Sequence, residues 1–136
     1  MPQHQTRLRV RYAETDQMGV VYHSNYLIWM ELGRTEYCRA IGIRYRDMEA
    51  QDGILLAVVD VHCRYIVPAR YDDEVIVTTE IASANRRMVE FQYDICGQDG
   101  QALARGETKH IFLGPDMKPT RLPEKYHAYF GISQKH

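Results

Sequence analysis

The sequence predicts an α+β fold in which one long helix lies across a five-stranded antiparallel sheet. Residues 24–41 carry apolar side chains at spacings of three and four, which is the period of an amphipathic helix. Five other segments alternate apolar and polar residues, as strands do, and four of them follow one another with short turns between them. Because the chain has 136 residues, we expect a single domain, residues 1–136, with one core.

The first strand and the long helix are predicted in the N-terminal third. In residues 6–12, three arginines alternate with apolar residues, which predicts a strand with one solvated face. Ser24 or Asn25 can cap the start of the helix. The apolar stripe of this helix contains Tyr26, Trp29, Met30, Gly33, Tyr37, Ala40 and Ile41.

Two glycines in this region predict backbone geometry. Gly33 lies in the middle of the helix, where glycine costs up to about 1 kcal/mol in helix propensity. We therefore expect a compensating close approach of the helix to the sheet at Gly33. Gly42 stands where a left-handed residue usually follows the end of a helix.

Four more strands are predicted after residues 44–53, a polar segment for which a short helical turn is one interpretation. These strands span residues 55–67, 74–83, 88–97 and 101–113. Pro68 ends the first of them, and residues 98–100 predict a hairpin turn. Small side chains in the last strand match a closely packed helix; the inner row contains Ala102, Ala104, Gly106, Thr108, His110 and Phe112. A short final helix is predicted at residues 124–130.

Composition excludes several classes of function. A formal net charge of -1 argues against general binding to nucleic acid or to an acidic membrane. No apolar run approaches the roughly 20 residues that cross a bilayer, and the N-terminus lacks the apolar segment of a signal peptide. The three cysteines, Cys38, Cys63 and Cys96, suit buried, reduced thiols in a cytoplasmic protein. His62, His110 and His127 lack the spacing of metal ligands, so no metal site is expected.

The candidate chemistry lies between the first strand and the long helix. Asp16 occupies a short irregular loop, and His23, Ser24 and Asn25 lead into the helix. The first N–H groups of a helix have no partner within the helix and stabilise negative charge. A carboxylate in front of such donors fits a hydrolytic site, because one group prepares water and the other stabilises an oxyanion. The alternative is an ordinary capped helix after an acidic loop.

Residues 12–37 begin Tyr-Ala-Glu-Thr-Asp-Gln-Met-Gly-Val-Val-Tyr-His-Ser-Asn-Tyr, and this stretch resembles the active-site segment of hotdog-fold acyl-CoA thioesterases. More narrowly, it resembles the 4-hydroxybenzoyl-CoA thioesterase family and its branch associated with the Tol-Pal genes. Residues 65–73 resemble a second recurring stretch of that family. The resemblance implies the hotdog fold, in which a five-stranded sheet wraps around one long central helix, and it implies hydrolysis of a thioester.

The resemblance also implies site residues. The catalytic carboxylate of the family falls on Asp16, as general base or as nucleophile, and the backbone N–H that polarises the thioester carbonyl falls on His23. The ring of His23 either shuttles a proton or plays no part. Glu14 stands where many members carry aspartate, and we expect no consequence. The rival carboxylate is Glu31, for which an ion pair with Arg34 or a contact with Thr35 at helical spacing is the simpler interpretation.

Substrate contacts follow from the same comparison. We expect them from the loop and the helix start, at Tyr12, Gly19, Val20, Tyr22 and Asn25, although core packing is an alternative for both tyrosines and capping for Asn25. The phosphates of coenzyme A call for cations. Arg86 and Arg87 are the first choices, followed by Arg70 and Arg121, and a solvated turn is the alternative for each.

No cofactor is expected, since coenzyme A is part of the substrate. Acyl carrier protein is a second candidate donor of the acyl group. In this fold the site lies between subunits, so we expect a homodimer or a homotetramer built as a dimer of dimers. Two other functions compete with acyl-CoA hydrolysis: a hotdog hydratase or dehydratase, and a non-catalytic acyl-CoA-binding module. Short aliphatic, long aliphatic and aromatic acyl groups all remain open.

Overall fold

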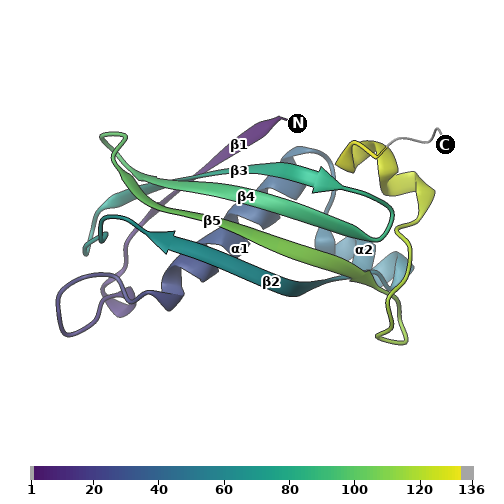
Figure 1. Cartoon of the computed structure of the whole chain (residues 1–136), viewed down its shortest axis with the longest axis horizontal. Coiled ribbons are helices and arrows are strands. Elements are labelled where there is room, and N and C mark those ends of the chain that lie inside the picture. Colours follow the sequence, from purple (N-terminus) through teal and green to yellow (C-terminus); the bar gives the residue numbers. More distant parts are fainter. Residues whose placement is uncertain (1, 133–136) are drawn as a thin grey trace.

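The structure is a computed structural model that describes residues 2–132, and it contains the predicted five-stranded antiparallel sheet (Figure 1). The elements are β1 (Gln3–Arg9), η1 (Tyr12–Glu14), α1 (Ser24–Ala40), α2 (Tyr45–Asp52), β2 (Leu55–Tyr65), β3 (Glu74–Ala84), β4 (Met88–Gly97), β5 (Ala102–Leu113) and η2 (Glu124–Phe130). The strand order is β1-β3-β4-β5-β2, and every neighbouring pair is antiparallel. The α+β prediction is therefore confirmed.

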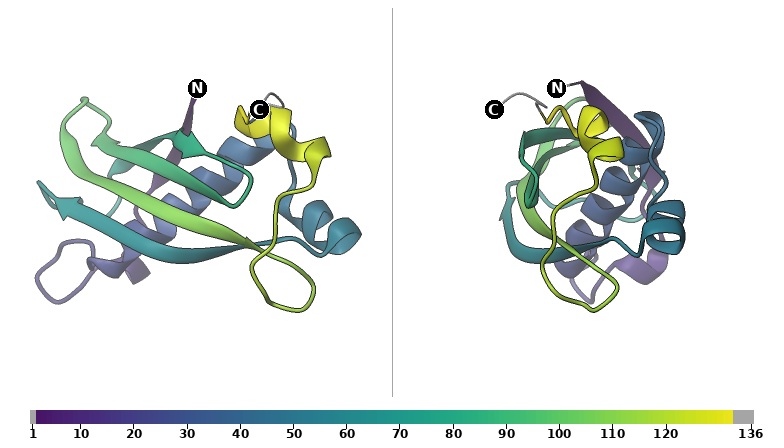
Figure 2. Two further views of the ribbon diagram at one scale, coloured as in Figure 1. Left: turned by 45° about the vertical axis from the view of Figure 1, so that its right-hand side comes forward. Right: turned by 90° about the vertical axis from the view of Figure 1, so that its right-hand side faces the viewer.

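Helix α1 lies along one face of the sheet, which curves partly around it (Figure 2). Its buried side is formed by Tyr26, Trp29, Met30, Gly33, Tyr37 and Cys38. A Cβ atom at Gly33 would lie 2.6 Å from Thr79 Oγ1 and 2.8 Å from Val77 Cγ1, both on β3. The predicted close approach at Gly33 is confirmed, and so is the left-handed backbone at Gly42, where φ is 104°.

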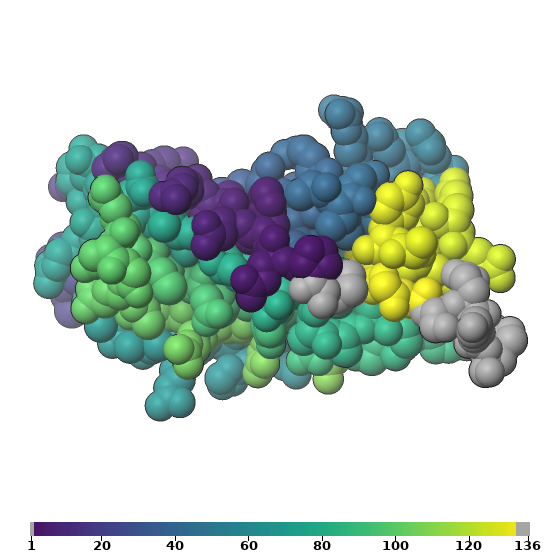
Figure 3. Space-filling view, turned by 90° about the horizontal axis from the view of Figure 1, so that it is seen from above, coloured from purple at the N-terminus to yellow at the C-terminus, as the bar shows by residue number. Residues whose placement is uncertain are grey.

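One long helix is not the whole helical content of the chain. Residues 45–52 form α2, which ends at Gly53 in a left-handed conformation, and two short 3-10 helices, η1 and η2, complete the fold. Helix α2 was ambiguous in the sequence because only Met48 of its eight residues is buried. Figure 3 shows η2, in yellow, at the end of the molecule opposite the loop that joins β1 to α1.

Two strand predictions need correction. Strand β1 is displaced towards the N-terminus, and Tyr12 lies in η1 with 76% of its surface exposed, so it belongs to no strand face. Polar inward residues such as Thr6 conceal the alternation of β1. Strand β2 ends at Tyr65, before the predicted end at residue 67, and has a bulge between Val58 and Asp60. It is an edge strand paired only with β5.

A buried polar chain links α1 to the sheet. Arg34 Nη1 donates to the Tyr93 hydroxyl at 3.1 Å, that hydroxyl lies 2.7 Å from Thr108 Oγ1, and His110 Nε2 lies 2.8 Å from the same oxygen. Burial, with a further contribution from the Arg34 charge, lowers the pKa of His110 to about 3. The predicted ion pair between Glu31 and Arg34 is wrong, since the guanidinium turns inwards to the sheet.

All three cysteines are free thiols, but only Cys38 is buried, and Cys63 and Cys96 are half-buried. Within residues 2–132, no cluster of three or more His, Cys, Asp or Glu side chains could hold a metal ion. The same part of the chain has no helix long and apolar enough to cross a membrane.

Candidate active site

The loop between η1 and α1 is a tight hairpin. Thr15 pairs with Val21, the Asp16 N–H donates to the Val20 carbonyl at 2.9 Å, and the Gly19 N–H donates to the Asp16 carbonyl at 3.0 Å. Gly19 has a φ of 79°, which a residue with a side chain rarely adopts. These backbone bonds fix the position of the Asp16 backbone.

The carboxylate of Asp16 is held at one oxygen. Asp16 Oδ1 accepts the Met18 N–H at 2.8 Å, and the side chain is partly exposed. Its Oδ2 has no hydrogen-bond partner among the described residues. The group is therefore oriented while one oxygen stays available to a water molecule or a substrate.

The start of α1 has free donors close to this hairpin in the chain. His23 is the N-cap residue, two positions beyond the paired Val21, and neither its N–H nor that of Ser24 has an acceptor within residues 2–132. The predicted side-chain cap is absent, because Asn25 Nδ2 instead donates to the Glu14 carbonyl at 2.9 Å. Donors left free in this way can stabilise an oxyanion.

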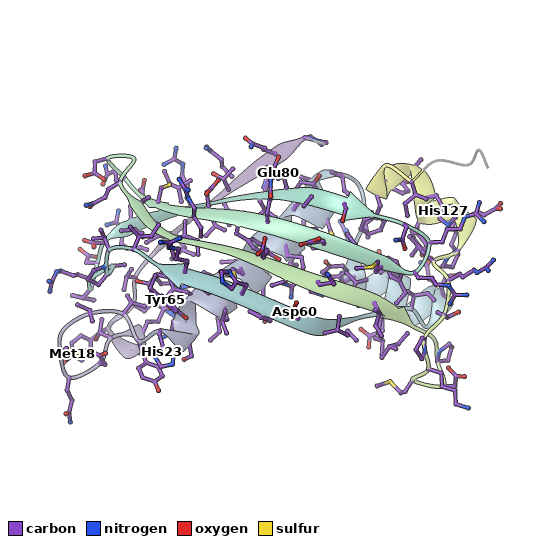
Figure 4. The ribbon with its side chains drawn as sticks, in the orientation of Figure 1. Met18, His23, Asp60, Tyr65, Glu80 and His127 are labelled. Atoms are coloured by element: carbon purple, nitrogen blue, oxygen red, sulfur yellow. The ribbon has the colours of Figure 1, made fainter. Side chains whose placement is uncertain are left out.

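A small cavity adjoins the helix start. It has a volume of about 190 Å³ and is lined by Val21, His23, Tyr26, Tyr65, Ile66, Val67 and Pro68. His23 and Tyr65 lie at the same end of the molecule (Figure 4), and the His23 ring packs on Tyr22 at 4.4 Å between centroids. The end of β2 was missed as part of this site, although the recurring stretch that begins at Tyr65 carried the signal.

Several predicted substrate contacts lie near the hairpin but outside this cavity. Tyr12 packs edge-on against Tyr71 and does not line this cavity, and nor do Gly19 and Val20. Arg70 lies beside the hairpin, because its backbone bridges to that of Val20.

The remaining cations are far from this loop. Arg86 and Arg87 lie in the β3–β4 turn, at the opposite end of the molecule (Figure 1), where the Arg86 carbonyl accepts the Leu122 N–H at 2.8 Å. Arg121 precedes that residue. A single chain therefore does not bring these three arginines to Asp16.

Glu14 has a structural importance that the sequence prediction missed. The residue is only 4% exposed, one carboxylate oxygen accepts the Arg11 N–H at 2.8 Å, and the other accepts the Trp29 Nε1–H at 2.9 Å. Burial raises the pKa of Glu14, but the hydrogen bonds from Arg11 and Trp29 outweigh burial and bring it below the usual range. Glu31, by contrast, lies exposed on α1.

Comparison with known proteins fits this arrangement of hairpin, helix start and sheet. The family model of the thioesterase-like superfamily matches residues 10–130, which are most of the chain. The chain belongs to the thioesterase-like superfamily.

Relatives in this superfamily cover nearly the whole chain. The candidate acyl-CoA thioesterase YneP of Bacillus subtilis (strain 168) is 39% identical over 127 residues, which are 90% of this chain and 91% of that protein. The acyl-CoA thioester hydrolase YbgC of Escherichia coli O6:H1 is 32% identical over 124 residues, 90% of this chain and 92% of that protein. The crystal structure of DHNA-CoA thioesterase from Staphylococcus aureus superposes with a TM-score of 0.92 at 35% identity, over 96% of this chain and 90% of that one.

Proposed function

We propose that this chain is an acyl-CoA thioesterase, which hydrolyses the thioester of an acyl-CoA to a free carboxylic acid and the thiol of coenzyme A. The superfamily and the names of its relatives support this activity. The observation that carries the proposal is that two features lie close together in the chain. One is the oriented carboxylate of Asp16 with one free oxygen, and the other is the pair of free N–H groups at the start of α1.

Asp16 acts in one of two ways in this proposal. As a general base, it takes a proton from water while the water oxygen attacks the carbonyl carbon, and the tetrahedral intermediate then breaks its C–S bond and releases the thiolate. As a nucleophile, it attacks that carbon itself, the thiolate leaves, and water then cleaves the mixed anhydride. In both routes one proton of the water molecule ends on the thiolate, the acyl group leaves as the carboxylic acid, and Asp16 is regenerated as a carboxylate. Both routes use the free Oδ2 of Asp16.

The backbone of His23 and Ser24 serves as the oxyanion hole. A donor of this kind contributes about 3–4 kcal/mol to the transition state, because it points at charge that develops only during the reaction. The positive end of the α1 dipole acts in the same direction. The small cavity lined by Tyr65 and Val67 accommodates the part of the acyl group next to the carbonyl.

A second copy of the chain completes the site in this proposal. The edge strand β2 has no partner on its outer side among the described residues, and its Val59 and Val61 are 52% and 42% exposed. Such an edge is suited to association with another chain. In a homodimer, or in a tetramer of two dimers, Arg86 and Arg87 of a neighbouring chain are candidates for the phosphates of coenzyme A.

The finer assignments follow from the sequence resemblance. We place the chain in the 4-hydroxybenzoyl-CoA thioesterase family and its Tol-Pal-associated branch, as one cytoplasmic hotdog domain over residues 1–136 without a cofactor. Acyl carrier protein is a second donor to be tested, because its phosphopantetheine arm presents the same thioester.

The Asp16→Asn variant tests the proposal. We expect it to keep its fold and its affinity for acyl-CoA but to lose at least 100-fold in turnover, measured by release of free thiol from short, long and aromatic acyl-CoA esters. Glu31→Gln is the matched control and should keep turnover within twofold. Turnover of Asp16→Asn close to that of the wild type would remove Asp16 from the mechanism.

A further inference from the structure

We propose that Glu14 is a positioning residue that sets the distance between the Asp16 hairpin and the oxyanion-binding start of α1. This inference rests on the proposed function, because it concerns the same site. It assigns a task to a carboxylate that the sequence comparison treats only as a variant of aspartate.

Glu14 accepts four hydrogen bonds, which come from both sides of the site. Its side chain accepts the Arg11 N–H at the start of η1 and the indole N–H of Trp29 in the second turn of α1. Its backbone carbonyl accepts the Tyr22 N–H at 2.8 Å and Asn25 Nδ2 at 2.9 Å. One residue thus joins η1, the returning arm of the hairpin and the first two turns of the helix.

The position of Glu14 in the chain makes these bonds relevant to the chemistry. Asp16 follows two residues later, after Thr15, which pairs with Val21 across the base of the hairpin. The atoms bound by Glu14 therefore lie on both sides of the hairpin that carries Asp16. If these bonds were lost, the hairpin and the helix start could move relative to each other, and such a shift strongly affects a positioned catalytic group.

Only an ionised carboxylate of this length satisfies the arrangement. Both partners of the side chain are N–H donors, so both side-chain oxygens must accept. Glutamine offers one oxygen, and its NH₂ group would face one of the two donors. Aspartate is one methylene shorter, so we expect it to lose one of the two bonds from the same backbone position. Substrate has no access to the carboxylate, because Glu14 is buried and both of its oxygens are already bonded.

Asp52 offers a matched control. Its carboxylate also joins two elements, α2 and η2, by accepting the Tyr126 hydroxyl and lying 2.9 Å from Lys125 Nζ. These elements lie at the end of the molecule opposite the Asp16 hairpin (Figure 1). Removing the charge of Asp52 weakens a similar connection without touching the site.

The experiment compares Glu14→Gln, Glu14→Asp, Trp29→Phe and Asp52→Asn with the wild type, well below each melting temperature. We expect a loss of at least tenfold in kcat for Glu14→Gln, with KM within threefold, and a partial loss for Glu14→Asp. Asp52→Asn should lower the melting temperature and keep kcat within twofold. Because Trp29 is the single tryptophan of the chain, its indole N–H resonance should shift in both Glu14 variants and stay unchanged in Asp52→Asn.

The double variant Glu14→Gln/Trp29→Phe separates positioning from general destabilisation. If Glu14 acts through Trp29, the double variant should lose little more kcat than Glu14→Gln alone. A folded Glu14→Gln protein with the kcat of the wild type overturns the proposal, and so does a loss of activity that only follows the melting temperature. If Glu14→Gln does not fold, Trp29→Phe with unchanged kcat overturns it equally. The wild type and Asp16→Asn in the same assay keep the two questions apart: no thiol release by the wild type contradicts the proposed function, and full activity of Asp16→Asn contradicts the role of Asp16.

Discussion

The hydroxyl group of Tyr65 donates a hydrogen bond of 3.0 Å to the backbone carbonyl of His23, which ties the end of β2 to the start of α1. That carbonyl belongs to the planar peptide group whose N–H is contributed by Ser24. Holding the oxygen therefore also orients the N–H on the other side of the peptide group. Strand β2 thus helps to aim one of the two donors proposed for the oxyanion.

We expect Tyr65→Phe to reduce kcat by about fivefold, since losing one hydrogen bond of about 1 kcal/mol loosens this peptide group. The aromatic ring and its packing remain, so the melting temperature should change little. Steady-state kinetics with a short acyl-CoA ester measures the effect. Tyr129→Phe, a change at an exposed tyrosine of η2, is the control and should leave kcat unchanged. A Tyr65→Phe enzyme that matches this control would show that the hydroxyl has no role in the reaction.

Two substitutions at His23 separate its ring from its backbone. The ring has no hydrogen bond among the described residues, so His23→Ala should keep kcat within about threefold. The backbone φ of His23 is -56°, which proline adopts readily, so His23→Pro removes the N–H with little strain at that residue. We expect His23→Pro to lose about 100-fold in kcat or more. Circular dichroism confirms that both variants are folded, and equal kinetics for the two would exclude the His23 N–H as a donor.

The sequence predicts the parts of the fold that repeat a pattern over many residues. The period of residues 24–41 placed α1 within one residue, and the alternation in residues 88–97 placed β4 without error. The prediction placed β1 too far towards the C-terminus. Its inward residues include Thr6 and His4, whose polarity removes the contrast between the two faces of the strand. A period identifies an element only where burial separates apolar from polar residues.

The site was predictable only in part. Asp16 and the helix start are near each other in the chain, so spacing was enough to suggest them. Tyr65 is 42 residues from His23, and only the folding of β2 beside α1 brings the two together. Glu14 was missed because its partner Trp29 looks like an ordinary apolar residue of the helix stripe, and its indole N–H becomes important only when a carboxylate is buried beside it.

Gly33→Ala should destabilise the protein by about 1–3 kcal/mol, although alanine is the better helix former by about 1 kcal/mol. The added methyl group would overlap Thr79 Oγ1 and Val77 Cγ1, which belong to well-packed side chains of β3. Urea unfolding measures the free energy of unfolding. The opposite result, a gain in stability, would mean that the helix and sheet can move apart at this point without loss.

The free energy of unfolding should fall in mild acid because of His110. Burial holds the pKa of His110 at about 3 in the folded protein, whereas an unfolded histidine has a pKa of about 6.5. Between these values the unfolded chain binds a proton that the folded chain does not, so lowering the pH favours unfolding. From pH 6 to pH 5 the loss attributable to His110 should be about 1 kcal/mol.

His110→Gln isolates this contribution, because glutamine is uncharged and can still bond to Thr108 Oγ1. All other ionisable groups are the same in both proteins, so their contributions cancel in the comparison. Urea unfolding at pH 7, 6 and 5 should therefore give the wild type a steeper loss of stability than the variant, even if the variant is less stable at pH 7. Parallel pH dependences would show that His110 takes up a proton in the folded protein as easily as in the unfolded chain, and that the buried link to Thr108 and Tyr93 tolerates a charge.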